Sequence, residues 1–377
     1  MRRRTRSSRI FECGDVRRAV TRSGGPGRLT PLEIASGFVF GFSPPTPVLA
    51  PFEIGTLTQR EALERAILPA LMRPPCLMSF SGGCASSAIL AVAVHLARRE
   101  GLELPVPATN RVDGSASADD TARQERVIIS LGVTEWVRLE VADELDLVGP
   151  VAMRVLRRHG FLWPSYAHLS LPLIEWASGG SLITGLGYRN ALGDPGALLR
   201  RDLDPLPWLR PSAQREVRAR WTADAASRPS AEHHRLGWWG RLRRVRVGIE
   251  LLRRLGAELR VQVCHPLIDP MFSAALGQLP LHRRSTHALF EDLLPPELLA
   301  RPTSSTDKDA FWGARSRELA AAWQGEGVDP DLVDAAALQI QWSLQRPDPR
   351  TFLLLQSVAL TRESLMASSS VVSAARS

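Results

Sequence analysis

Lysine is almost absent from this chain, although the chain is strongly basic. Lysine and arginine together number 47 against 39 acidic residues, and Lys308 is the only lysine. The formal charge of +8 favours acidic partners such as nucleotides, nucleic acid or an acidic peptide. In the densest basic patch, Arg241–Arg260, arginines alternate with leucines at helical spacing, which indicates a solvated helix face. Because no aromatic stacking platform accompanies these arginines, we do not expect a nucleic-acid partner.

Cysteine pairs and long apolar runs are missing as well. The four cysteines form no Cys-x-x-Cys motif, which argues against a zinc ribbon or a disulfide framework. The longest clear apolar run, Ala88–Leu96, contains His95 and is too short to cross a bilayer. No apolar segment of secretory type follows the basic N-terminus. We therefore expect a cytoplasmic protein without a membrane partner.

The sequence does contain a short buried strand that leads into a glycine turn and an apolar helix. The pattern predicts the strand at Leu77–Phe80, the turn at Ser81–Gly83 and a buried helix through Ala88–Leu96. A glycine turn at a helix N-terminus is an anion site, because free N–H groups and the helix dipole face the ligand. The hydroxyl groups of Ser81, Ser86 and Ser87 add donors. For this stretch alone, a buried turn of small residues without a ligand remains the alternative.

Strands and helices alternate as far as about residue 200. Four strands are predicted, at Leu77–Phe80, Leu102–Thr109, Glu135–Val141 and Gly180–Gly185. Such alternation implies parallel pairing and a doubly wound α/β sheet, in which ligands bind beyond the carboxyl ends of the strands. The turns at Gly82–Gly83 and at Gly185–Gly187 both follow predicted strands, so they can face one ligand.

Four parts are predicted along the chain. Residues 1–60 are irregular, apart from a short helix that Thr30 would cap, and Thr58 would cap a further helix running to Leu71. Residues 61–200 form the α/β core, and residues 201–366 form a helical C-terminal part. Residues 367–377 are rich in small side chains and are predicted to be a frayed tail.

The first turn, Ser81-Gly82-Gly83-Cys84-Ala85-Ser86, resembles the pyrophosphate-binding loop of the N-type ATP pyrophosphatases, Ser-Gly-Gly-x-Asp-Ser. It is most similar to that of the synthetase domain of asparagine synthetase, whose relatives include the β-lactam synthetases and the lasso-peptide cyclases. The stretch from Thr184 to Asn190 resembles the family's second loop, Thr-Gly-x-Gly-Gly-Asp-Glu. His265–Pro270 and Leu294–Pro302 resemble two further family segments, so the resemblance covers roughly residues 60–360.

The resemblance implies an adenine nucleotide alpha-hydrolase-like fold and ATP-dependent amide formation. In that reaction ATP activates a carboxylate as an acyl-adenylate, pyrophosphate leaves, and an amine attacks. The implied nucleotide-binding residues are Ser81, Gly82, Gly83, Ser86, Ser87, Thr109 and Gly185. Arg189 and Lys308 are the implied catalytic residues, because Arg189 could neutralise phosphate charge and Lys308 is the only lysine available for the acyl-phosphate region.

Two positions depart from the family in a way that bears on magnesium. Ala85 and Arg189 stand where the family has acidic ligands, and Mg²⁺ prefers carboxylate oxygens. The Mg²⁺ that the family uses therefore lacks its ligands here, and we predict no metal site. Losing both acids should remove several kcal/mol of transition-state stabilisation. A replacement could come from Arg189 itself or from Asp119, Asp120 or Asp194.

A glutaminase domain is not expected. Arg2 follows Met1, and only about 60 residues precede the synthetase-like part. Nitrogen would then come from free ammonia, a substrate amine or a partner enzyme chain. Two functions stay open at this point. The first is ATP-dependent adenylation of a carboxylate or peptide substrate followed by amide-bond formation, impaired by the missing acids. The second is an inactive pseudoenzyme that acts as a binding or scaffold partner in a peptide or natural-product pathway.

Overall fold

A single parallel sheet organises the chain. The computed structural model describes residues 28–43, 57–112, 118–192, 205–230, 232–300 and 311–374. Its five strands are all parallel and follow the order β3-β2-β1-β4-β5. They are β1 (Cys76–Ser79), β2 (Val106–Val112), β3 (Val137–Val141), β4 (Ser181–Ile183) and β5 (Gln262–Cys264). The predicted parallel α/β sheet is therefore confirmed, with the first strand at its centre.

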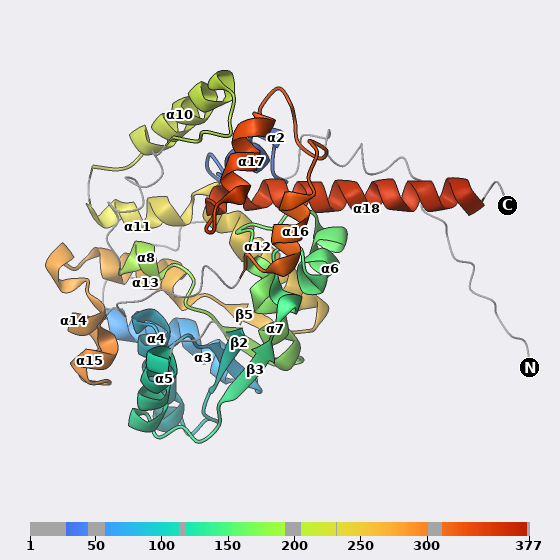
Figure 1. The fold of residues 1–377 in the computed structure, drawn as a ribbon. Helices are drawn as coiled ribbons and strands as arrows, with labels where there is room; N and C mark the ends of the chain where they lie inside the picture. The colour runs from blue at the N-terminus through green and yellow to red at the C-terminus, as the bar shows by residue number, and fades with distance from the viewer. Residues whose placement is uncertain are drawn as a thin grey trace, which may run out of the picture.

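Helices cover both faces of the sheet, because side chains of each strand alternate between the faces. Met78 and Ile183 join a core with α3, α4 and α5, whereas Leu77 and Leu182 pack on the opposite face with α6, α7 and α12. Figure 1 shows the strands between these helices. On the first face the helices are α3 (Gln59–Leu71), α4 (Cys84–Glu100) and α5 (Ala118–Ser130). On the second face they are α6 (Pro150–His159), α7 (Leu171–Trp176) and α12 (Arg243–Glu258).

The strand β5 was not predicted. The sequence patterns gave only helices after residue 200, yet β5 pairs with β4 and completes the sheet. It is three residues long and only partly buried, so no apolar run marks it. The second strand begins later than predicted, at Val106, because Leu102 lies just past the end of α4, where its N–H donates to the carbonyl of Ala97 (2.8 Å). The sheet thus extends across the predicted boundary at residue 200.

A third core, rich in tryptophan, lies away from the sheet. It joins α2, α10, α16, α17 and the first half of α18. Its indole N–H groups find acceptors, as when Trp208 donates to the carbonyl of Ala35 (2.8 Å) and Trp342 to the hydroxyl of Thr351 (3.1 Å). The remaining helices are α2 (Pro31–Ser36), α8 (Tyr188–Ala191), α10 (Pro211–Ala226), α11 (Glu232–Gly240), α13 (Pro270–Gly277), α14 (Thr286–Phe290), α15 (Pro296–Leu299), α16 (Ala314–Ala321), α17 (Ala335–Ser343) and α18 (Phe352–Ala374). Short 3-10 turns include Asp143–Leu145 and Ala167–Ser170.

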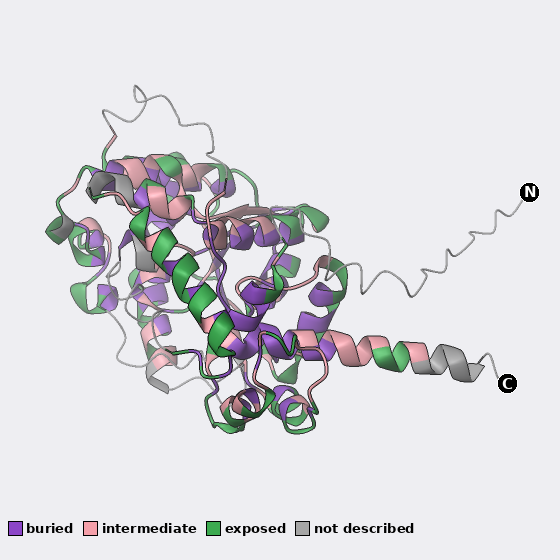
Figure 2. Ribbon diagram, turned by 90° about the horizontal axis from the view of Figure 1, so that it is seen from above, coloured by how far each residue is buried: buried purple, intermediate pink, exposed green. Residues whose placement is uncertain are grey.

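The C-terminal helix α18 is longer than expected. It stays helical to Ala374, past residue 366, where the frayed tail was predicted to begin. Figures 1 and 2 show it extending away from the rest of the chain, and its buried residues lie near its start. None of the helices in the described ranges combines the length and the apolar character needed to span a membrane.

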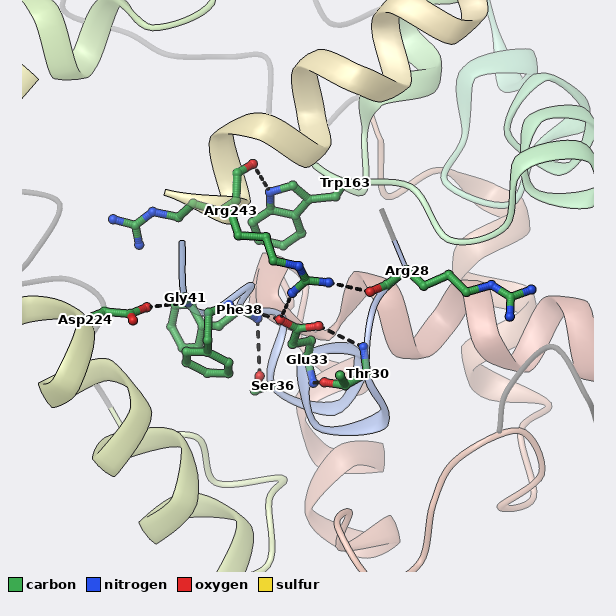
Figure 3. A network of polar contacts seen from close by, with 11 residues as sticks. Arg28, Thr30, Glu33, Ser36, Phe38, Gly41, Trp163, Asp224 and Arg243 are labelled. Atoms are coloured by element: carbon green, nitrogen blue, oxygen red, sulfur yellow. Dashed lines mark hydrogen bonds and ion pairs between the residues drawn. The ribbon is translucent and has the colours of Figure 1, made fainter. Parts of the chain in front are cut away.

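The N-terminal segment 28–43 is anchored to α12 by a polar network (Figure 3). Thr30 and Glu33 form a capping box at the start of α2, and Thr58 and Glu61 form another at α3, which confirms both predicted caps. The buried carboxylate of Glu33 also accepts a hydrogen bond from the backbone of Phe40 (3.1 Å) and pairs with Arg243. Local capping and a distant ion pair therefore use the same side chain.

Candidate nucleotide-binding site

Two glycine turns meet at the carboxyl edge of the sheet. The strands β1 and β4 are direct neighbours, and the chain continues from them to opposite halves of the sheet, which makes this position a topological switch point. One turn follows β1 and the other follows β4. A Cβ built on Gly185 would lie 3.9 Å from the Cβ of Ala85, so the two turns are in contact. The expectation that both turns lie at strand ends is confirmed.

The first turn ends in a helix start without a side-chain cap. Gly82 has a φ of +73°, and Gly83 is the N-cap of α4. No side chain in the described ranges caps this helix, so its first N–H groups are available to an anion. The serine hydroxyls of the turn bind one another and the turn backbone. The Ser86 hydroxyl donates to the carbonyl of Gly83 (3.1 Å), and the Ser81 hydroxyl accepts from the N–H of Gly83 (3.3 Å).

Two side chains of α5, Arg123 and Gln124, hydrogen-bond to the backbone of this turn. The Nε–H of Arg123 donates to the carbonyl of Gly82 (2.8 Å), and its other nitrogens donate to three carbonyls at the end of α15 (2.6 to 3.1 Å). The amide of Gln124 donates to the carbonyl of Ser81 (3.1 Å). Burial lowers the pKa of the Arg123 guanidinium, whose charge lies close to the turn. No sequence pattern connected Arg123 or Gln124 with the turn, because both lie on an otherwise ordinary amphipathic helix.

Two predicted nucleotide-binding residues have different surroundings. Ser87 is fully buried, and its hydroxyl has no partner in the described part of the chain. Thr109 is buried too, but its hydroxyl donates to the carbonyl of Phe80 (2.6 Å) and accepts from the indole N–H of Trp136 (3.0 Å). Thr109 therefore ties β2 to the end of β1, and its hydroxyl proton is already used within the protein.

Residues of the second turn contact side chains of other elements. Thr184 hydrogen-bonds through its hydroxyl to Nδ1 of His265 (2.7 Å). Gly187 has a φ of +99°, and a Cβ there would lie 2.5 Å from Ile268. The hydroxyl of Tyr188 accepts from the thiol of Cys84 (2.8 Å), which links the second turn to the start of α4. Burial lowers the pKa of His265 to about 4, so its imidazole is neutral at pH 7.

Of the two predicted catalytic residues, the structure describes only the backbone of Arg189. The backbone of Arg189 lies in α8, directly after Tyr188 and at the same edge of the sheet, but its side chain is outside the described structure. Lys308 and Asp194 also lie outside the described residues.

The described residues around the turns do not fit magnesium. Within the described ranges, no group of three or more His, Cys, Asp or Glu side chains could hold a metal ion. At the first turn Ala85 offers no ligand, and its methyl group faces Gly185. Comparison with models of protein families and with curated proteins finds no match for this chain. The argument for function therefore depends on the site itself, where uncapped N–H groups and the charge of Arg123 favour an anionic ligand.

Proposed function

We propose that the chain binds ATP across the carboxyl ends of β1 and β4 and uses it to adenylate a carboxylate, which an amine then converts to an amide. The resemblance to asparagine synthetase supplies the reaction class. The observation that supports it best is the uncapped start of α4 in contact with a second glycine turn at the switch point. On this proposal the sheet is an adenine nucleotide alpha-hydrolase-like fold.

ATP fits the donors that the first turn offers. The N–H groups at the start of α4 and the positive end of its dipole suit phosphate oxygens. The buried Ser87 hydroxyl adds an unused donor in the same turn of helix. Arg123 donates to the carbonyl of Gly82, which pairs an acceptor that would otherwise repel phosphate. ATP supplies the leaving pyrophosphate, and the chain supplies its binding and orientation.

Magnesium has no step in this proposal, because the described residues do not fit it. Charge on the leaving pyrophosphate would instead be neutralised by arginine, which pairs bidentately with phosphate. Arg189 is the residue that the sequence places for this role. Lys308 remains the proposed contact for the acyl-phosphate region.

A pseudoenzyme is the second candidate, and one contact favours it. Where the family has a glycine followed by acids, this chain has Tyr188, whose hydroxyl bonds Cys84 and Thr286 (2.9 Å). The tyrosine thus fastens the second turn to α4 and α14. A turn fastened in this way suits a binding or scaffold role better than a loop that must release pyrophosphate.

Calorimetry and pyrophosphate release separate these functions. We expect ATP to bind with a Kd on the order of micromolar, and a carboxylate substrate from a panel of amino acids and peptides to trigger pyrophosphate release. Binding without release for the whole panel would support the pseudoenzyme. Absence of ATP binding would reject nucleotide binding altogether.

A restoring variant sharpens this test. Ala85→Asp combined with Arg189→Asp returns both acids of the family pattern. If the rest of the site is functional, this double variant should release pyrophosphate faster with Mg²⁺ than without it. Ala85→Asn with Arg189→Asn is the matched control, because it adds similar volume without carboxylate charge. Equal rates for the two double variants would show that the missing acids do not limit the reaction.

A further inference from the structure

Three polar residues form a row across the switch point on the face of the sheet opposite α4. Ser79 ends β1, Thr184 follows β4, and His265 follows β5. The registers of β1 with β4 and of β4 with β5 place them opposite one another. Because neighbouring strands are about 4.8 Å apart, the row reaches roughly 10 Å from β1 to β5. The row was not identified from the sequence, because β5 itself was not predicted.

The hydrogen bonds of Thr184 determine which ring nitrogen of His265 carries the proton. The hydroxyl of Thr184 lies 2.7 Å from Nδ1 of His265 and accepts from the N–H of Leu186 (3.4 Å). If Nδ1 carried the proton, the buried hydroxyl of Thr184 would have no acceptor among the described residues. Thr184 therefore donates to Nδ1, and the ring carries its proton on Nε2.

The Nε2–H of His265 has no partner among the described residues. The atom is closed to solvent, and no residue in the described ranges accepts from it. Burial disfavours the charged ring, so the group is a neutral donor at pH 7. A buried donor without an acceptor is costly, and natural proteins keep few of them. At the other end of the row, the half-buried Ser79 makes no side-chain hydrogen bond with a described residue. Two unused polar groups thus share one face of the carboxyl edge.

We propose that the Nε2–H of His265 donates a hydrogen bond to an oxygen of the AMP half of bound ATP. The proposal rests on the nucleotide binding proposed above. The amides at the start of α4 take the pyrophosphate half, and the row crosses the same carboxyl edge of the sheet from β1 towards β5. Thr184 is the positioning residue, since its hydroxyl fixes the ring tautomer. Because Nε2 is closed to solvent, the contact requires a local shift at this edge of the sheet when the ligand binds.

Two substitutions at this position separate the ring nitrogens. His265→Gln places an amide N–H near the site of Nε2, whereas His265→Asn keeps a group near Nδ1 for Thr184 and removes the Nε2 donor. Calorimetry with ATP, AMP and pyrophosphate as separate probes then measures each half of the site. We expect His265→Asn to weaken ATP and AMP binding roughly tenfold and to leave pyrophosphate within about twofold, while His265→Gln stays close to the wild type.

Other results would contradict the proposed hydrogen bond from His265 to the AMP half. If both variants bind AMP and ATP as the wild type does, Nε2 makes no contact and only this inference fails. If His265→Asn weakens pyrophosphate as much as AMP, the ring supports the turn and does not contact the AMP half. If the wild-type chain binds none of the three probes, the nucleotide-binding function fails and this contact with it.

Nitrogen NMR on the wild-type chain with ¹⁵N-labelled histidine tests the tautomer without a substitution. We expect a neutral ring protonated at Nε2, assigned through its correlation with the backbone of His265, and an Nε2–H resonance that moves on addition of AMP. A ring protonated at Nδ1, or a resonance that AMP does not move, contradicts the proposal. This measurement remains decisive if either variant fails to fold.

Discussion

The first turns of α2 and α4 differ in whether side chains pair with their free backbone N–H groups. Both helices leave backbone N–H groups unpaired at their first turn. At α2, Thr30 and Glu33 pair with these groups, and Glu33 also binds Phe40 and Arg243 (Figure 3). At α4, the N-cap is Gly83, and no described side chain caps the first N–H groups.

This difference separates a structural helix start from a binding one. The capped start joins the N-terminal segment to α12 and leaves nothing for a ligand. The uncapped start lies at the switch point, where a ligand can pair with the free groups. Substitutions at the start of α2 should therefore lower stability most, and substitutions at the start of α4 should weaken ligand binding most.

Glu33→Ala should give the largest loss of stability. It leaves the guanidinium of Arg243 partly buried without its carboxylate and removes the acceptor for two backbone N–H groups. Breaking such a pair typically lowers the free energy of unfolding by about 3–5 kcal/mol. Urea unfolding measures the change, with Thr30→Ala as the control at about 1 kcal/mol. A loss no greater than that of the control would mean that the ion pair adds nothing to the cap.

Arg123→Ala should affect both stability and binding. It removes donors to the carbonyl of Gly82 and to three carbonyls at the end of α15. We expect the free energy of unfolding to fall by about 2–3 kcal/mol, because charged donors make the stronger hydrogen bonds. Affinity for ATP should fall as well, since the turn loses its support. Arg126→Ala, on the exposed side of the same helix, should change neither quantity. Unchanged ATP affinity in Arg123→Ala would show that the turn holds its shape without this side chain.

Acid should weaken the region around the sheet through its buried histidines. Burial lowers the pKa of His265 to about 4 and also lowers the pKa of His168, which lies near Asp146. Between pH 6.5 and these lowered values the unfolded chain binds protons that the folded chain does not. Stability that is present above about pH 6.5 is therefore lost as the pH falls towards 4. For His265 the loss at pH 5 is at most about 2 kcal/mol. Urea unfolding of His265→Gln should show a smaller loss between pH 7 and pH 5, and equal losses would assign the effect to other groups.

Gly82→Ala and Gly101→Ala form a matched pair with a smaller effect. Both glycines have positive φ, but a Cβ at Gly101 meets open space, whereas one at Gly82 would lie 2.5 Å from Gln124. Gly101→Ala should lose about 1 kcal/mol of stability from backbone strain alone. Gly82→Ala should lose somewhat more and should also reduce ATP affinity, because Gln124 must move away from the turn. Similar ATP affinities in the two variants would place the ligand away from this turn.

Sequence patterns correctly predicted the interactions whose partners lie close together in the chain. Thr30 and Thr58 were predicted as caps because the capping residue and its partner lie three positions apart. The glycine turns were found for the same reason. Arg123 and His265 were not identified as parts of the site, because their partners are 41 and 81 residues away in the chain. The short strand β5 was missed because three half-buried residues leave no periodic signal.

The sequence by itself determined the parallel α/β class, the two glycine turns and the non-acidic residues Ala85 and Arg189 within them, since each depends on residue type and spacing along the chain. Only the tertiary structure decided that these turns touch, that Tyr188 bonds Cys84, and that Ser79, Thr184 and His265 form one row. The physical reason is that strand order and register place neighbours that are far apart in sequence. A pattern of hydrophobic residues fixes which face of a strand is buried, but it does not fix which strand lies beside it.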